Sequence, residues 1–332
     1  MPTIGIPNVS PLLEAELEIS MERVESLLRS HIEGDYPLVV ETSRHLVEAG
    51  GKRLRPLLTL ITAQFGDPSA RGIIEAAVVC ELTHLATLYH DDVMDEAPLR
   101  RGVESANDRW GNTIAILTGD YLFAKASDLL ADLGTDAVRL QARTFERLVI
   151  GQITETQGPQ NGEDPLEHYL QVVADKTGSL IATSAKFGAM LSGASREVTE
   201  TVTKFGEKIG VAFQLADDVI DIASESNQSG KTPGTDLREG VPTLVTLNVM
   251  RSTDKADKEL QKLLKKPIKD TKTVNQVLKA LRDHKALDQS RLQLHQVAKE
   301  AREALGPLPV SDASAALFSL CDAVVDRSTW FH

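Results

Sequence analysis

Two helical runs of this chain end in the same pattern of aspartates, and this repetition restricts its fold more than any other feature. Residues 73–89 read IIEAAVVCELTHLATLY, which is apolar on almost every side, as in a helix inside a protein. Asp91, Asp92 and Asp95 follow at once. Carboxylates at positions i and i+4 share one helix face and repel each other, so they need a bound cation or full solvation. Because a buried helix precedes them, we expect Asp91 and Asp95 to face a cavity that holds a cation.

The second aspartate group lies in FQLADDVIDI, at residues 213–222. Asp217 and Asp221 again have the i, i+4 spacing, Asp218 lies beside them, and Gln214 falls on the same helical stripe. Carboxylate oxygens suit Mg²⁺, which binds through one or two carboxylates together with substrate phosphates. Two such groups facing each other would hold a diphosphate between metal ions. The alternative is that each group forms a solvated acidic face or caps a helix.

Composition excludes several other classes of protein. The chain has 332 residues, 42% of them hydrophobic, and no stretch rich in Pro, Gly or Ser divides it, so we expect one domain over residues 1–332. The net charge of −12 argues against nucleic-acid binding, which demands a basic face. Cys80 and Cys321 are too few for a disulfide framework, and neither a signal peptide nor a membrane-spanning run is recognisable. We therefore expect a cytoplasmic protein.

Helical periodicity dominates the sequence, and no convincing alternation of period two indicates strands. The chain is therefore expected to be all-α. Polar residues 224–240 form the one long loop expected within the core region, and helices resume at Val241. Helices are predicted over residues 11–33, 36–48, 57–65, 69–95, 113–132, 136–157, 166–192 and 196–223.

Basic residues near the first aspartate group are candidates for binding phosphate. Lys52, Arg53 and Arg55 lie in GKRLRP, a loop that enters a helix, and Arg100 and Arg101 follow the aspartates. Guanidinium forks and ammonium groups are the usual protein partners of phosphate. The alternative is an exposed basic turn in the first case and neutralisation of Asp95 in the second. On these residues alone both interpretations remain open.

Four further residues carry polar groups in places that suggest function. His84 lies two turns before Asp91 on the same helix face, although a lone histidine on an apolar face is more often part of the core. Lys176 and Thr177 enter an otherwise apolar helix, where a lysine usually extends to solvent. Lys231 has the glycine-flanked setting of a residue that closes on phosphate, but it is equally compatible with an ordinary polar loop.

The ordered set GGKRLRP, HDDVMDEAPLRRG, DKTG, FQLADDVID and GKTPGTDLREG resembles the trans-isoprenyl diphosphate synthases, the polyprenyl synthase family. The likeness spans roughly residues 50–244, and five motifs in the right order make it specific. The resemblance implies an isoprenoid synthase helical bundle with a central cavity lined by both aspartate groups. It also implies a prenyltransferase that joins isopentenyl diphosphate to an allylic diphosphate by trans 1'-4 condensation and releases pyrophosphate.

The resemblance also implies roles for individual residues. It suggests about three Mg²⁺ ions per active site, held by the two aspartate groups against the diphosphate. The implied metal ligands are Asp91, Asp92, Asp95, Asp217, Asp218 and Asp221. The implied binding residues are Arg100 for the allylic diphosphate, and Lys52, Arg55, His84 and Arg101 for isopentenyl diphosphate. Lys176, Thr177 and Gln214 would surround the reacting carbons, and Lys231 would close over the metal-bound diphosphate.

The sequence departs from the family pattern at one place of chemical interest. Many relatives read Glu-Gly-Lys after the second motif, whereas this chain reads Glu239-Gly240-Val241. A lysine able to contact diphosphate is missing. We expect weaker retention of metal and diphosphate, or compensation by Lys231, rather than loss of activity.

Product length in this family depends on what lies beneath the first aspartate motif. Thr87 and Ala86 lie about 6–7.5 Å down the helix from Asp91, and neither is bulky. We therefore expect the growing chain to pass, and each buried C5 unit would favour retention by up to about 4 kcal/mol. Elongation would stop at a deeper floor, for which Phe145, Phe187 and Met190 are unranked candidates. We expect a product longer than C15, in the range C30–C50.

Other functions compete with this one. A non-catalytic helical subunit that assists an active homologue would not need intact metal ligands, and a terpene cyclase would not need GKRLRP or a second DDxxD. A synthase of geranylgeranyl length is a further alternative. The allylic primer would be geranyl, farnesyl or geranylgeranyl diphosphate. The resemblance also implies a homodimer, and release of a long product suggests peripheral contact with a membrane.

Overall fold

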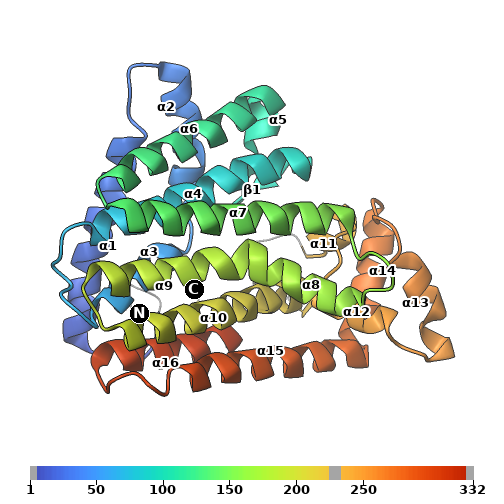
Figure 1. Ribbon diagram of the computed structural model, residues 1–332. Coiled ribbons are helices and arrows are strands. Elements are labelled where there is room, and N and C mark those ends of the chain that lie inside the picture. The colour runs from blue at the N-terminus through green and yellow to red at the C-terminus, as the bar shows by residue number, and fades with distance from the viewer. Residues whose placement is uncertain (1–5, 224–232, 327–332) are drawn as a thin grey trace. The chain divides into compact units, whose positions relative to one another are not determined.

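The structure is a computed structural model that describes residues 6–223 and 233–326. It is built almost entirely from helices (Figure 1), as the sequence predicts. The chain divides into two compact units. The first comprises Met1–Glu146, Leu180–Gly206 and Ala304–Leu320, and the second comprises Arg147–Ser179, Glu207–Glu303 and Cys321–His332. That the whole chain acts as one domain with a central cavity stays a prediction.

The first unit contains the N-terminal helices and a small hairpin. Ser10 accepts a hydrogen bond from the Leu13 amide at the start of the first helix, and Gly50, with a φ of 85°, follows the second. Its elements are α1 (Pro11–His31), α2 (Pro37–Glu48), α3 (Leu54–Ala63), α4 (Ile73–Met94), β1 (Leu99–Arg100), β2 (Val103–Glu104), α5 (Ala106–Trp110) and α6 (Asn112–Ala131).

Helix α4 is surrounded by other helices of the first unit, because it packs against α1, α3 and α6. Its residues from Ala76 to Thr83 are all buried, including Glu81, as expected for a helix that is apolar on almost every side. Its C-terminal end carries the first aspartate group, so the buried part of the helix fixes the position of these carboxylates.

A two-residue hairpin follows α4 and positions the two arginines. Leu99 pairs with Glu104 and Arg100 pairs with Val103 in an antiparallel register. Arg101 and Gly102 form the turn with φ values of 53° and 78°. The sequence did not predict these strands, because two residues are too few to show an alternating pattern.

The second unit contains the second aspartate group and most of the C-terminal helices. Its elements are α8 (Pro165–Val173), the π-helical turn η1 (Ala174–Gly178), α11 (Thr235–Glu239), α12 (Leu244–Met250), η2 (Lys255–Asp257), α13 (Lys258–Leu263) and α14 (Thr271–Arg282). Five helices have residues in both units: α7 (Thr135–Gln157), α9 (Ser179–Leu191), α10 (Arg196–Ala223), α15 (Lys285–Ala304) and α16 (Asp312–Val325).

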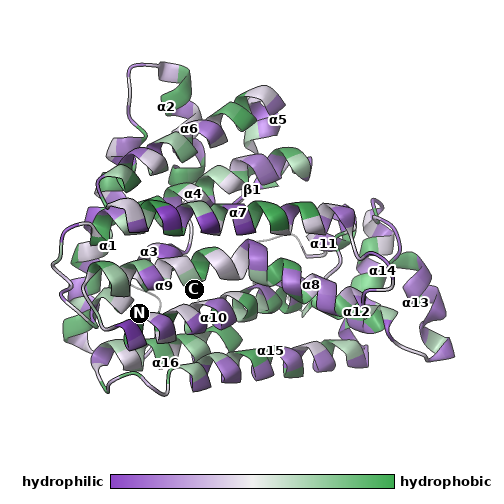
Figure 2. Cartoon of the chain, viewed as in Figure 1, coloured by the Kyte–Doolittle hydropathy of each residue, from purple (hydrophilic) through white to green (hydrophobic). Residues whose placement is uncertain are grey.

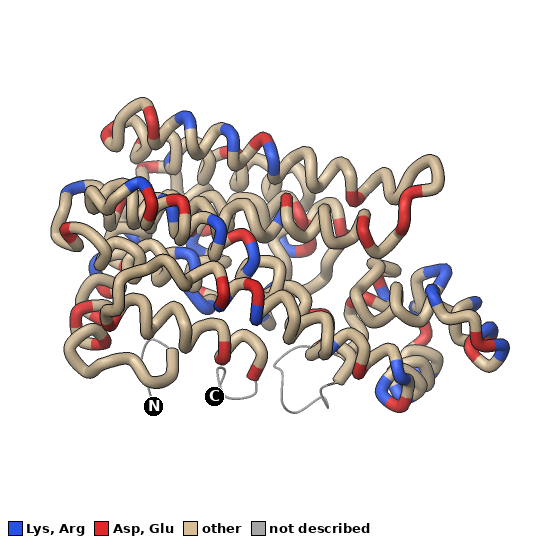
Figure 3. The backbone as a smooth tube through the Cα atoms, turned by 60° about the horizontal axis from the view of Figure 1, so that its bottom comes forward, with Lys and Arg blue, Asp and Glu red and all other residues tan. Residues whose placement is uncertain are grey.

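The core of the second unit forms where α10, α12, α14 and α15 bring apolar side chains together, among them Ile222, Val245, Leu281 and Leu287. Hydrophobic and hydrophilic residues alternate in bands along α15 (Figure 2), as expected for a helix with one buried face. The lysine-rich stretch over η2 and α13 is largely exposed, and positively and negatively charged residues are both frequent in this region (Figure 3).

The structure corrects three predicted boundaries. The helix expected over residues 166–192 is interrupted by η1. The loop expected over residues 224–240 contains α11 within its described part. The helix expected from residue 69 begins at Ile73, because Ser69 instead donates its amide and hydroxyl hydrogens to Asp67 in a preceding turn.

Candidate active site

The first aspartate group divides into a buried residue and two more accessible ones. Asp92 is fully buried, Asp91 is partly buried, and the Asp95 side chain is 41% exposed. The Asp95 amide donates to the Asp91 carbonyl at 2.8 Å, so the helical turn carrying both carboxylates is intact. The spacing read from the sequence therefore exists in the structure, while the metal-binding roles of Asp91, Asp92 and Asp95 stay predictions.

Arg100 reaches back from the hairpin to this group. Its Nε lies 2.5 Å from Oδ1 of Asp92, and its Nη2 lies 3.6 Å from Oδ2 of Asp95. Burial raises the pKa of Asp92, and the charge of Arg100 opposes that effect. The arginine is thus already held by the motif, with its side chain 28% exposed.

Arg53 is the middle basic residue of GKRLRP, and its side chain is bound by other residues of the protein. It has a φ of 46°, a left-handed conformation that is unfavourable for a non-glycine residue. Its guanidinium contacts Glu25 at 2.5 Å, Glu81 at 2.7 Å and the Val47 carbonyl at 3.1 Å. These partners offset the backbone strain.

Arg55, His84 and Arg101 form a group of basic residues near α4. Burial lowers the pKa of Arg55 and lowers that of His84 well below its usual value, and neighbouring arginines lower the His84 pKa further. Arg101 donates to the carbonyls of Leu46 and Gly50, and its Nη2 lies 4.0 Å from Glu81. The buried Nε of Arg55 has no hydrogen-bond partner in the described structure. A region with this excess of cations is suited to an anion.

Ala86 and Thr87, the predicted chain-length positions, lie on α4 one to two turns before Asp91. Ala86 is fully buried, and the Thr87 hydroxyl donates to the His84 carbonyl at 2.7 Å. Of the deeper candidates, Phe187 is fully buried, and the Phe145 ring lies 4.5 Å from the ring of Phe123. Neither observation tests a role in product length.

The second aspartate group repeats the division seen in the first. Asp218 is buried and accepts hydrogen bonds from the Tyr169 hydroxyl, the Leu244 amide at 2.8 Å and the Gln214 amide at 3.3 Å. Burial, followed by the charge of Asp236, raises the pKa of Asp218 to about 7, against the opposing effect of these hydrogen bonds. Asp217 and Asp221 are partly buried on α10.

Tyr169 and Asp236 were not predicted from the sequence as neighbours of this group. Tyr169 lies 49 residues before Asp218, so no local pattern connects them. Asp236 lies within the quoted motif GKTPGTDLREG, so its presence there was the available signal.

Lys176 and Thr177 lie in the π-helical turn η1 rather than on a regular helix. The Lys176 ammonium contacts Oε2 of Glu155 at 2.5 Å, and the Thr177 hydroxyl lies 3.4 Å from Oε1 of Gln214. The turn η1 thus carries Lys176 and Thr177, and it brings Thr177 close to Gln214. Lys231 lies outside the described residues.

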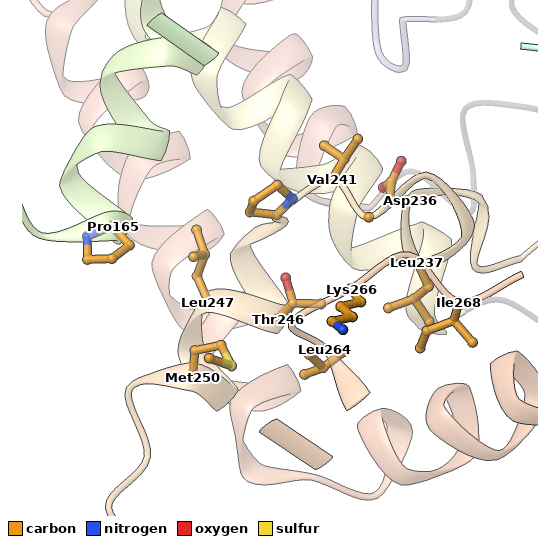
Figure 4. Close-up of a pocket in the computed structure, with 12 residues that line it drawn as sticks. Pro165, Asp236, Leu237, Val241, Thr246, Leu247, Met250, Leu264, Lys266 and Ile268 are labelled. Carbon is orange, nitrogen blue, oxygen red and sulfur yellow. The ribbon is translucent and has the colours of Figure 1, made fainter. Parts of the chain in front are cut away.

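Val241, at the position where many relatives have lysine, lines a mainly apolar cavity of about 220 Å³ in the second unit. Figure 4 shows it near Asp236, with Leu247 and Met250 among the apolar side chains of the cavity. A valine suits this apolar lining, but it cannot contact a phosphate.

The carboxylates present fit Mg²⁺ better than a metal held by protein alone. Within residues 6–223 and 233–326, no three His, Cys, Asp or Glu side chains gather closely enough to hold an ion. Mg²⁺ does not need such a cage, since it keeps waters and takes one or two carboxylates together with phosphate oxygens. Asp91 with Asp95, and Asp217 with Asp221, provide pairs of this kind one helical turn apart.

No helix among the described residues has both the length and the apolar character needed to cross a membrane.

Comparisons with known proteins agree with these observations. The family model for polyprenyl synthetase matches residues 36–281. A nonaprenyl diphosphate synthase of Mycobacterium tuberculosis is 45% identical over 97% of both chains. A geranylgeranyl pyrophosphate synthase of Corynebacterium glutamicum, solved with calcium and isoprenyl diphosphate, has a TM-score of 0.85 and 44% identity, covering 96% of this chain and 98% of that one. A decaprenyl diphosphate synthase of Rhodobacter capsulatus has a TM-score of 0.86 and 32% identity, covering 95% and 98%.

Proposed function

The chain belongs to the polyprenyl synthetase family, and we propose that it condenses isopentenyl diphosphate with an allylic diphosphate in successive trans 1'-4 steps. It is a chain-elongating prenyltransferase whose product is longer than C15. One observation best supports the proposed substrates. In the first unit, Arg100 contacts Asp92 and Asp95 of the first motif. Arg101 lies near enough to both Arg100 and Arg55 to interact with them electrostatically. Such a combination suits metal-bound diphosphates, because carboxylates hold the metal while guanidinium groups hold the phosphate oxygens.

Asp91, Asp95, Asp217 and Asp221 would hold Mg²⁺ in this proposal. When bound, the metal ions stabilise the negative charge that develops on the departing diphosphate. Asp92 and Asp218 were also predicted as ligands, but their burial and their hydrogen bonds favour a role in fixing the motifs. The proposal requires both motifs for one reaction, so alanine at Asp91 or at Asp217 should each abolish product formation.

The side chains supply binding and orientation. Arg100 would contact the allylic diphosphate, whereas Lys52, Arg55, His84 and Arg101 would bind isopentenyl diphosphate. As the allylic C1–O bond breaks, the double bond of isopentenyl diphosphate forms a new bond to C1. A proton is then lost, and the departing pyrophosphate accepts it. Lys176, Thr177 and Gln214 would surround the reacting carbons, and a pocket without water would protect the cation.

We propose a product in the range C30–C50. The absence of a bulky side chain at Ala86 and Thr87 supports this length. The similarity to a nonaprenyl diphosphate synthase supports it as well. The 44% identity to a geranylgeranyl pyrophosphate synthase supports the shorter alternative, so an assay must decide.

We also propose that the protein is a homodimer in the cytoplasm that contacts membranes only peripherally. Ile116 and Leu117 on α6 are 42% and 57% exposed, and such apolar side chains are typical of a face covered by a second copy. Light scattering after size-exclusion chromatography would give twice the monomer mass. A monomer at micromolar concentration would contradict the dimer.

The function is tested with purified protein, Mg²⁺, isopentenyl diphosphate and each of the geranyl, farnesyl and geranylgeranyl primers. We expect pyrophosphate release and products longer than C15 on reversed-phase chromatography, with activity lost when a chelator removes the metal. An Asp91→Ala variant is the matched negative control. If the wild-type protein releases no pyrophosphate with any primer, the non-catalytic subunit becomes the better interpretation.

A further inference from the structure

The π-helical turn η1 is built into the second unit by an unusual set of contacts. Such turns are rare, and they occur frequently at functional sites. The amide of Ser179 donates to the Ala174 carbonyl, five residues earlier, so the helical path widens where Lys176 and Thr177 project. Because π-helical turns are rare, the question is which side chains support this one.

Arg147 on α7 supplies that support. Its Nε lies 2.5 Å from Oδ1 of Asp175, inside the turn. Its two terminal nitrogens form a fork on Glu207 of α10, with Nη2 at 2.9 Å from Oε2, and Nη2 also lies 3.4 Å from the Ala174 carbonyl. The hydrogen bonds to Glu207 and then to Asp175 raise the pKa of Arg147 despite its partial burial. One guanidinium therefore ties the turn to two helices.

Both carboxylate oxygens and the backbone carbonyl of Asp175 accept hydrogen bonds. Its Oδ2 accepts from the Gln171 amide at 2.7 Å, and its carbonyl accepts from the Ser179 hydroxyl at 2.5 Å. With Arg147 on Oδ1, the residue before Lys176 has little freedom to move.

Two glycines let the turn approach its neighbours closely. A Cβ at Gly151 of α7 would lie 2.9 Å from Cβ of Asp175 and 3.1 Å from the Lys176 amide nitrogen. A Cβ at Gly178 would lie 3.1 Å from the Glu207 carbonyl oxygen. The turn is thus packed against α7 and α10 at backbone distance.

The energetics of this network indicate a role other than stability. The Arg147 side chain is 37% exposed and Glu207 is 33% exposed, and ion pairs of this exposure contribute little to folding. What the fork geometry does provide is direction, since a bidentate contact fixes orientation as well as distance.

We propose that Arg147 is a positioning residue, which with Asp175 and Glu207 holds η1 so that Lys176 and Thr177 are preorganised for the condensation. This inference rests on the proposed function of those two residues. Losing the fork would leave the turn folded but free to shift, and shifts of about 1 Å at a reacting group lower rates by up to about 100-fold.

The test compares Arg147→Met and Arg147→Lys with Arg302→Met, which removes another arginine ion pair of the second unit, to Asp322 at 3.1 Å. We expect Arg147→Met to lower kcat about tenfold or more while KM for either diphosphate changes less than about twofold. Arg147→Lys should recover part of kcat, because an ammonium contacts one carboxylate but cannot form the fork. Arg302→Met should leave kcat unchanged.

A double-mutant cycle separates positioning from a general loss of structure. In a background that carries both Lys176→Ala and Thr177→Ala, Arg147→Met should lower kcat by less than about twofold, because both groups that Arg147 positions are then gone. An equal fold-loss in both backgrounds would overturn the inference. If Arg147→Met does not fold, the same comparison is made with Arg147→Lys.

A readout independent of activity completes the experiment. Hydrogen exchange at the amides of residues 175–179 should be faster in the Arg147 variant than in Arg302→Met. Unchanged protection of these amides would refute the positioning role even if kcat fell. An inactive wild-type protein would instead refute the proposed function, while the exchange data would still decide whether Arg147 holds the turn.

Discussion

Arg100 places its Nε 2.5 Å from the carboxylate of Asp92, a residue whose side chain is fully buried. In the second motif the equivalent middle residue, Asp218, is also buried and accepts hydrogen bonds from a backbone amide and a tyrosine hydroxyl. Each motif thus contains one buried aspartate, flanked by two that are more accessible. The three carboxylates of a DDxxD motif are not interchangeable in this chain.

The first prediction concerns that division. Asp92→Asn removes the charge that holds Arg100, so KM for the allylic diphosphate should rise about tenfold and the free energy of unfolding should fall by about 2 kcal/mol. Steady-state kinetics with varied primer, together with urea unfolding, measure both effects.

Asp95→Asn is the contrasting variant at an exposed carboxylate of the same motif. It should leave the free energy of unfolding within about 0.5 kcal/mol of wild type and raise the Mg²⁺ concentration needed for half-maximal activity. If the two variants show the same loss of stability, Asp92 has no special structural role.

The second prediction concerns product length. Ala86 is fully buried on α4, so a series Ala86→Val, Ala86→Leu and Ala86→Phe adds volume stepwise beneath Asp91. The product should shorten with increasing volume, and the largest side chain should cost about 1–3 kcal/mol of stability through overpacking. Reversed-phase chromatography of products from variants that remain folded is the measurement. Unchanged product lengths across the series would show that Ala86 does not face the growing chain.

Much of the fold could be predicted from local patterns. The helices α4, α7 and α10 were expected within a few residues of their ends, because long periodic runs and flanking glycines fix such elements. The turn η1 could not be predicted, since residues 174–178 have no composition that distinguishes an i→i+5 turn from a regular one. The hairpin at Leu99 was missed because two-residue strands carry no alternation.

The residues of the site that belong to motifs could be predicted from the sequence. The residues that reach the site only through tertiary contacts could not. The motif residues were identified from type and spacing, but no pattern shows that Arg53 pairs with Glu81 or that Arg147 pairs with Glu207. These partners are 28 and 60 residues apart, and only folding brings them together. Residues that position others are therefore the class that motif analysis overlooks.

The third prediction concerns the departure from the family pattern. Val241→Lys places an ammonium beside the cavity that Asp236 lines, and the charge of Asp236 acts on Asp218 of the second motif. If the new ammonium reaches the metal-bound diphosphate, pyrophosphate should inhibit more strongly, with Ki lowered about threefold to tenfold. Val241→Met is the matched control, because it adds length without charge to the same apolar cavity. Equal Ki values for the two variants would mean that the missing charge is unimportant here.

The fourth prediction is a pH dependence that arises from His84. Burial, followed by the charges of Arg55, Arg101, Arg53 and Arg100, holds the pKa of His84 well below its usual value in the folded protein. The unfolded chain takes up a proton near pH 6.5, whereas the folded protein stays neutral at this residue.

Stability from the neutral His84 is therefore fully present above about pH 6.5 and decreases as the pH falls toward the lowered folded-state pKa, by up to about 1.4 kcal/mol per pH unit. His84→Gln cannot titrate, so between pH 7 and pH 5 it should lose about 1–2 kcal/mol less stability than wild type. Urea unfolding at both pH values measures this difference. An equal loss in the two proteins would mean that His84 is already able to take up a proton in the folded state, and that the surrounding arginines do not exclude it.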